Sequence, residues 1–309
     1  MRRASRAALL VATSLASLAS SSLAATTQER PAPPPVRPAA DAETLAAAER
    51  GSVRALLEIA ERRARSGDLA GATEPLRAAL SLAPSSERAL AAWARTAMAS
   101  RAPGPALLAL EPLARMHPGV PEYSYLLGVA WMQLGDMQSA LPHLERAREL
   151  EPRRALNLVA IGLAHNQSKR YPEAKAVLEE ALRLAPDDAE ALAAMAEAEE
   201  GLGEHDEAER HAKRALELAP RHGEALLVLG LVHMQRERHA DARAAFEASL
   251  AAAPGSARAH YQLSLACARL GDRDCAAREV ALYQKALREI EERLVAIRRQ
   301  SLEAGQAQP

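Results

Sequence analysis

Few side chains in this 309-residue sequence are placed where they could do chemistry together. Its two cysteines, Cys267 and Cys275, are eight residues apart, which is not the CxxC spacing of a thiol–disulfide catalyst. The nine histidines form no cluster with cysteine at zinc-ligand spacing. No GxSxG, Walker A or HExxH pattern occurs either. The sequence therefore predicts no enzyme, and neither a metal nor any other cofactor.

The residues that recur at fixed spacing indicate helices. An alanine comes twelve residues before each of six prolines, and a larger apolar residue usually follows four residues after that alanine. Residues at i, i+4 and i+7 share one face of a helix, and small residues there allow two helices to approach closely. The period is 34 residues, and its markers are Pro84, Pro118, Pro152, Pro186, Pro220 and Pro254, with Ala72, Ala106, Ala140, Ala174, Ala208 and Ala242 before them.

This pattern resembles the tetratricopeptide repeat family, whose units have this length. The resemblance implies an all-α fold, a right-handed superhelical α-solenoid of antiparallel helix pairs. Pro103, Pro105 and Pro112 predict a short or kinked second helix in the second unit. Arg288 replaces the seventh proline, so the last helix should continue as a cap. We assign the solenoid to residues 41–300, with units at about 53–86, 87–120, 121–154, 155–188, 189–222, 223–256 and 257–290.

The two ends of the chain predict export and a disordered tail. Residues 1–24 combine Arg2, Arg3 and Arg6 with an apolar stretch and small residues, as in a signal peptide cleaved after Ala24. An uncleaved anchor is the alternative. Residues 25–40 are a Pro-rich disordered linker, and residues 301–309 a disordered tail. We expect a periplasmic or secreted protein without a stable membrane span after leader removal.

The net charge and the two cysteines give further information about possible partners and about the compartment. The formal net charge is −1, and loss of the leader makes the chain mildly acidic, so we expect no nucleic-acid partner. Cys267 and Cys275 would face each other across the turn of the seventh unit. They form a disulfide in an oxidising compartment, or they are two buried small side chains that never meet. The sequence leaves both interpretations open.

The resemblance also implies where a ligand would bind. In this family the first helix of each unit lines a concave groove, and four positions per helix face it. Several of these positions carry apolar residues here, with Met and Tyr suited to adaptable contacts, and the fifth unit adds carboxylates. The candidate groove residues are Tyr125, Val129, Met132, Leu163, Glu197, Glu200, Leu227, Leu231, Met234 and Tyr261.

The leading hypothesis is a non-enzymatic scaffold or adaptor of the cell envelope that binds a partner peptide or helix in this groove. The alternative is a binder of an envelope polysaccharide or another non-protein ligand. The last helix adds a second surface, because Ile290, Leu294 and Ile297 continue a heptad seam beyond the last unit. These three residues either fold back on the chain or pair with a second copy in a homodimer.

Overall fold

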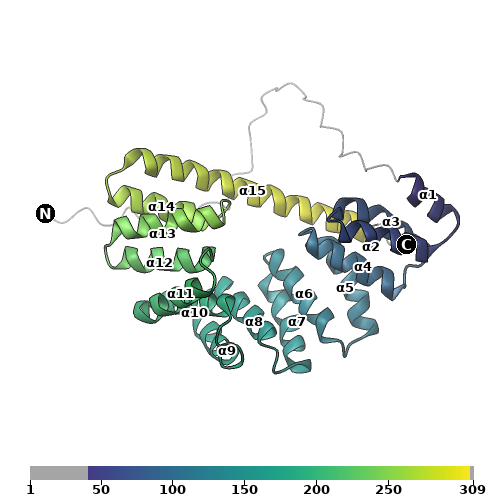
Figure 1. Cartoon of the computed structure of the whole chain (residues 1–309), viewed down its shortest axis with the longest axis horizontal. Coiled ribbons are helices and arrows are strands. Elements are labelled where there is room, and N and C mark those ends of the chain that lie inside the picture. Colours follow the sequence, from purple (N-terminus) through teal and green to yellow (C-terminus); the bar gives the residue numbers. More distant parts are fainter. Residues whose placement is uncertain (1–40, 307–309) are drawn as a thin grey trace, which may run out of the picture. The chain divides into compact units, whose positions relative to one another are not determined.

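The computed structural model describes residues 41–306, without the side chains of residue 293 and residues 297–306. Within that range the chain consists of helices and short turns (Figure 1). In chain order the helices are α1 (Ala42–Glu49), α2 (Val53–Arg65), α3 (Leu69–Leu82), α4 (Glu87–Ala99), α5 (Pro103–Met116), α6 (Pro121–Gln133), α7 (Met137–Leu150), α8 (Ala155–Gln167), α9 (Tyr171–Leu184), α10 (Ala189–Leu202), α11 (His205–Leu218), α12 (Gly223–Gln235), α13 (His239–Ala252), α14 (Ala257–Arg269) and α15 (Arg273–Gln306).

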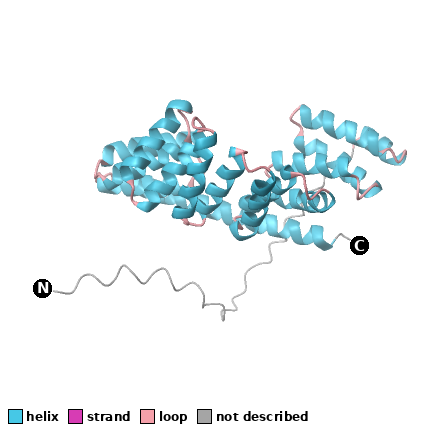
Figure 2. Cartoon of the chain, turned by 90° about the horizontal axis from the view of Figure 1, so that it is seen from below, coloured by secondary structure: helices cyan, strands magenta, loops and turns pink. Residues whose placement is uncertain are grey.

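From α2 onward the helices form seven consecutive pairs, and each pair packs against the next. Connections of a few residues join the two helices of a pair, which makes them antiparallel neighbours. No strand occurs among the described residues (Figure 2). The predicted all-α solenoid of about seven repeats is therefore confirmed. None of the described helices has both the length and the apolar character needed to cross a membrane.

Local residue choice explains where these helices begin and end. The hydroxyls of Ser52, Ser86 and Ser256 accept hydrogen bonds from the backbone three residues later, which caps α2, α4 and α14. Asp68 and Asp136 cap α3 and α7 in the same way. The periodic prolines come just after the second helix of each pair, where a proline prevents the helix from continuing.

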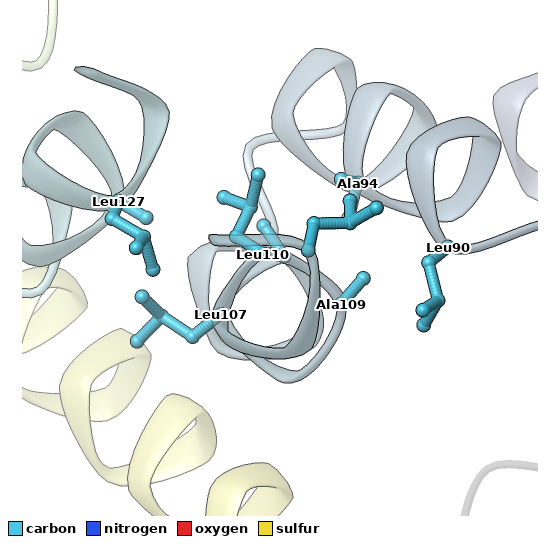
Figure 3. Close-up of a cluster of buried hydrophobic side chains, with 10 residues drawn as sticks. Leu90, Ala94, Leu107, Ala109, Leu110 and Leu127 are labelled. Atoms are coloured by element: carbon cyan, nitrogen blue, oxygen red, sulfur yellow. The ribbon is translucent and has the colours of Figure 1, made fainter. Parts of the chain in front are cut away.

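The core is continuous from one pair to the next. Figure 3 shows one part of it, where Leu90 and Ala94 of α4, Leu110 of α5 and Leu127 of α6 gather around α5. Each of these side chains is at least nine-tenths buried. Because neighbouring pairs share their core residues, an inner pair is stabilised from both sides.

Two helices are longer than the sequence led us to expect. Helix α5 is as long as α7, because Pro103 and Pro105 lie in its first turn, where no backbone N–H has an acceptor within the helix. Pro112 lies inside α5 without ending it. Helix α15 continues to Gln306 instead of ending near residue 300, since it meets no proline and is rich in helix-forming residues. The predicted leader, the linker and residues 307–309 lie outside the described residues.

Candidate partner-binding site

The apolar part of the candidate site is a hollow between α6 and α8. Tyr125, Val129 and Met132 of α6 and Leu163 of α8 line a cavity of about 380 Å³. All four side chains are half-buried, so they are held by neighbours and still reach solvent. A cavity of this size suits apolar side chains of a ligand. The other lining residues are Gln133, Leu156, Val159, Ala160, Gln167 and Glu190.

Tyr125 forms a fixed wall of the hollow. The guanidinium carbon of Arg154 lies 5.7 Å from the centre of its ring, which is a cation–π contact. Glu122 and Glu151 each accept a hydrogen bond from Arg154 at 3.0 Å and hold it in place. Burial, and then the Glu122 carboxylate, raise the pKa of the Tyr125 phenol. The hydroxyl therefore stays protonated near neutral pH and can donate a hydrogen bond to a ligand.

A carboxylate cluster lies further along the same row of first helices. Arg258 of α14 donates through Nη1 to Glu197 of α10 at 2.5 Å and to Glu224 of α12 at 2.8 Å. One guanidinium therefore links the fifth, sixth and seventh repeats. Burial raises the pKa of Glu200, which also interacts with the Arg258 charge. The predicted carboxylates Glu197 and Glu200 thus belong to a cluster that contains a built-in cation.

The cluster carries more negative than positive groups. Loss of surrounding water, and then the Glu197 carboxylate, raise the pKa of Glu224 to about 7, although 37% of its side chain is exposed. His222 lies 3.0 Å from Glu190, and this hydrogen bond lowers the pKa of Glu190 and raises that of His222. Carboxylates that share one arginine in this way would gain from a second cation.

The structure corrects two of the predicted groove residues. Leu227 and Leu231 are 1% and 8% exposed, and both belong to the core between the last repeats. They pack there with Leu263 of α14, because the first helices of consecutive repeats touch each other through these positions. Met234 is half-buried against the same core. Tyr261 is 44% exposed and its ring lies 5.4 Å from that of Tyr283 on α15.

The sequence already placed Glu190 in an acidic patch with Glu197 and Glu200, but the prediction missed Glu224 and Arg258 as site residues. Glu190, Glu224 and Arg258 all occupy the second position of their units, one of the four positions that face the groove in this family. The sequence therefore contained the information needed to find this cluster. It becomes visible only when the charged residues at the same position of three repeats are compared with each other. Asn166, an amide of the same row, is 3% exposed and donates to the Ala194 carbonyl oxygen at 2.8 Å, so it is not free for a sugar.

The seventh repeat contains a disulfide. Cys267 and Cys275 are bonded, with their Cα atoms 5.8 Å apart, and join α14 to α15. Beside them, Nδ1 of the buried His260 lies 2.8 Å from the Glu279 carboxylate, and its Nε2 lies 3.1 Å from the Pro254 carbonyl oxygen. Both ring nitrogens therefore face an oxygen atom. These contacts fix the start of α15 firmly on α14.

The seam residues of α15 differ in their surroundings. Ile290 is 45% exposed, whereas Leu294 is half-buried. The side chain of Ile297 is outside the described residues. Helix α15 packs against α5 as well as α14, so the last helix does fold back on the chain. Pairing with a second copy stays a prediction.

Comparison with known proteins gives the family. Tetratricopeptide repeat models match residues 91–155, 193–257 and 227–293, and a second such model matches residues 153–221. The chain therefore belongs to the tetratricopeptide repeat family, as the resemblance predicted. Members of this family are generally non-enzymatic and bind protein partners. No curated protein matches the chain.

Solved structures show the same fold at low sequence identity. A tetratricopeptide repeat protein from Parabacteroides merdae has a TM-score of 0.65 and 18% identity, with 79% of this chain and 98% of that chain covered. The structure described as the APC/C hetero-tetramer Cut9–Hcn1 has a TM-score of 0.58 and 19% identity, covering 72% and 44%. Pseudomonas aeruginosa pilF has a TM-score of 0.53 and 21% identity, covering 69% and 96%.

Proposed function

We propose that this protein is a non-enzymatic scaffold that holds a segment of a partner protein along its row of first helices. The observation that carries the proposal is the double role of Glu190. Its side chain lines the apolar hollow of Tyr125 and Met132, and it also pairs with His222 beside the carboxylate cluster. The apolar hollow and the negatively charged carboxylate cluster are therefore adjacent, and Glu190 belongs to both.

The chemistry of the two parts defines the ligand. The hollow accepts an apolar side chain such as Leu or Phe, which leaves water without losing hydrogen bonds. The carboxylate cluster attracts Lys or Arg, because Glu197, Glu200 and Glu224 face a single arginine, Arg258, while Glu190 pairs with His222. The partner segment thus carries an apolar residue and a basic residue separated along an extended or helical chain. No observation favours a polysaccharide ligand.

We further propose that the protein acts in the cell envelope, in the periplasm or outside the cell. The sequence of residues 1–24 supports export. The bonded pair Cys267–Cys275 is consistent with it, since structural disulfides persist in oxidising compartments.

The test uses the purified full chain and synthetic fluorescent peptides. Each peptide carries one Leu and one Arg, separated by Gly-Ser spacers of graded length, and binding is read by fluorescence anisotropy. Met132→Glu places a charge in the hollow and should weaken binding of the tightest-binding peptide by about tenfold or more. Gln138→Glu adds the same charge on an exposed site of α7 and should change nothing.

Peptides in which Glu replaces Arg should bind less tightly at low ionic strength, and the difference should shrink as salt is added. The proposal fails if no spacer length gives saturable binding. It also fails if Met132→Glu and Gln138→Glu bind the best peptide equally well.

A further inference from the structure

Helix α15 is much longer than its repeat requires. The second helices of the other repeats have 14 residues, whereas α15 has 34. The part equivalent to a normal second helix ends at Ala286, which is 6% exposed. The remaining stretch to Gln306 spans about 30 Å at 1.5 Å per residue. This extension reaches beyond the end of α14, so any packing partner it has must come from another part of the chain.

The base of α15 is fixed in direction. The disulfide of Cys267 and Cys275 and the buried pair of His260 and Glu279 join it to α14 within its first two turns. A long helix curves only gently unless a proline, a Gly/Ser pair or a bulge kinks it, and residues 273–304 contain neither proline nor glycine, so α15 keeps the direction of its base. The extension is therefore a rod that projects from a clamped base.

The far part of α15 meets the second repeat. Helix α15 packs against α5, and Figure 1 shows its C-terminal half running toward the first repeats. In Figure 3 the side chain of Leu107 on α5 points toward the ribbon of α15. Leu107 is 7% exposed. On α15, Leu294 is half-buried while its neighbour Val295 is 58% exposed, so Leu294 lies on the packed side.

We propose that α15 is a strap that sets the spacing between the apolar hollow and the carboxylate cluster. It thereby selects partners by the separation of their apolar and basic residues. This inference rests on the proposed function. The hollow is lined mainly by the third and fourth repeats and at its edge by Glu190 of the fifth, whereas the cluster extends from the fifth repeat to the seventh. The strap joins the seventh repeat to the second, so both parts of the site lie within the stretch that it spans.

Solenoid mechanics makes such a strap effective. Adjacent repeats contact only each other, so small rotations between repeats add up along the stack and change the spacing of distant positions. A ligand that fills two sites gains from their fixed separation, because its second contact then forms at a high effective concentration. Without the strap, part of the binding energy would be spent on ordering the intervening repeats.

The test compares Leu294→Glu with Val295→Glu in the full chain. Both variants add one carboxylate to adjacent residues of α15, outside the clamped base. Spin labels on cysteines introduced at the exposed residues Glu111 and Glu292 report the α5–α15 distance by pulsed electron resonance. We expect a narrow distribution in the parent and in Val295→Glu, and a longer, broader one in Leu294→Glu.

The same variants are titrated with the best Leu-Arg peptide and with a peptide that keeps only Leu. Leu294→Glu should weaken binding of the Leu-Arg peptide by about fivefold and leave the affinity for the Leu-only peptide unchanged. An unchanged distance distribution in Leu294→Glu overturns the strap, and so does an opened distribution with unchanged affinity. Absence of any peptide binding by the parent instead refutes the proposed function, and the distance measurement remains a separate readout.

Discussion

At the scale of single residues, the turn inside each helix pair repeats one backbone conformation. Gly67, Gly135, Gly203 and Gly271 have φ between 78° and 84°. At the same place in the other repeats, Arg101, Lys169 and Glu237 have φ of 52°, 56° and 59°. A side chain at such a φ places Cβ close to the backbone, which costs about 1–2 kcal/mol. Three of the seven turns therefore use a residue that the conformation disfavours.

Replacing one of these residues by glycine should stabilise the protein. We expect Lys169→Gly to raise the free energy of unfolding by about 0.5–1 kcal/mol, because relief of the unfavourable φ exceeds the entropy that glycine adds to the unfolded chain. Gly135→Ala, the reverse change in the preceding repeat, should lower it by a similar amount. Urea denaturation measures both. A Lys169→Gly variant less stable than the parent would contradict this account.

The raised pKa of Glu224 predicts a pH dependence. Its ordinary pKa of 4.5 is raised to about 7 in the folded chain, so the folded state holds this proton more tightly than the unfolded state. The resulting stability is present below pH 4.5 and is lost as the pH rises through 7. Water screens a partly exposed side chain, so the loss should be on the order of 1 kcal/mol.

Glu224→Gln removes this titration. The difference in unfolding free energy between Glu224→Gln and the parent should therefore move in favour of the variant between pH 5 and pH 8. Glu207→Gln, a change at an exposed carboxylate of α11, is the matched control and should give a flat difference. A flat difference for Glu224→Gln as well would show that its carboxyl is not perturbed.

Residue type predicted the apolar hollow better than the charged cluster. Tyr125 and Met132 could be found because each is conspicuous within its own unit. Arg258 was harder to find, since its contact with Glu197 crosses 61 residues of sequence and becomes visible only when the charges of several repeats are compared. Leu231 was predicted to face the groove but is buried. An apolar residue at a groove position can also pack against the next repeat, and the sequence does not distinguish the two cases.

At the scale of elements, contact between the two helices of a pair depends on glycine. A Cβ on Gly128, Gly162 or Gly230 would overlap the side chain of Leu144, Leu178 or Phe246 on the second helix. Each of these contacts lies within one 34-residue unit, so the repeat spacing itself indicates a close approach at these glycines. Helix ends and pair contacts are local in this sense, so the sequence predicts them well.

The fourth repeat offers a direct test of this contact. Gly162→Ala should lower the free energy of unfolding by about 1–3 kcal/mol, since the added methyl forces Leu178 to move in a filled core. Gly223→Ala is the control, because a Cβ there meets only ordinary contacts at 3.6 Å. Thermal and urea denaturation give both values. Equal stability of the two variants would mean that the core around Leu178 yields easily.

At the scale of the whole described chain, the repeat period predicts how neighbouring repeats stack. It does not predict the contact between α15 of the last repeat and α5 of the second. The packing of each second helix on the first helix of the next repeat recurs with the period, so one rule in the sequence predicts this packing throughout the stack. The packing of α15 on α5 occurs once and joins elements far apart in sequence. The heptad seam indicated an apolar surface at Leu294, yet a pattern on one helix contains no information about which distant helix receives it.

This contact between α15 and α5 predicts an unusual order of local opening. In an open solenoid the terminal repeats open most readily, since they have one neighbour instead of two. The strap gives the second repeat an extra partner, so amide exchange in α5 should be as slow as in the inner helix α7 rather than intermediate between α3 and α7. Leu294→Glu should raise the exchange rate of α5 by about fivefold or more while α8 to α10 keep their rates, and Val295→Glu should leave all of them unchanged. Hydrogen exchange read by mass spectrometry resolves these helices separately. If α5 exchanges at a rate between those of α3 and α7 in the parent, α15 does not support the second repeat in solution.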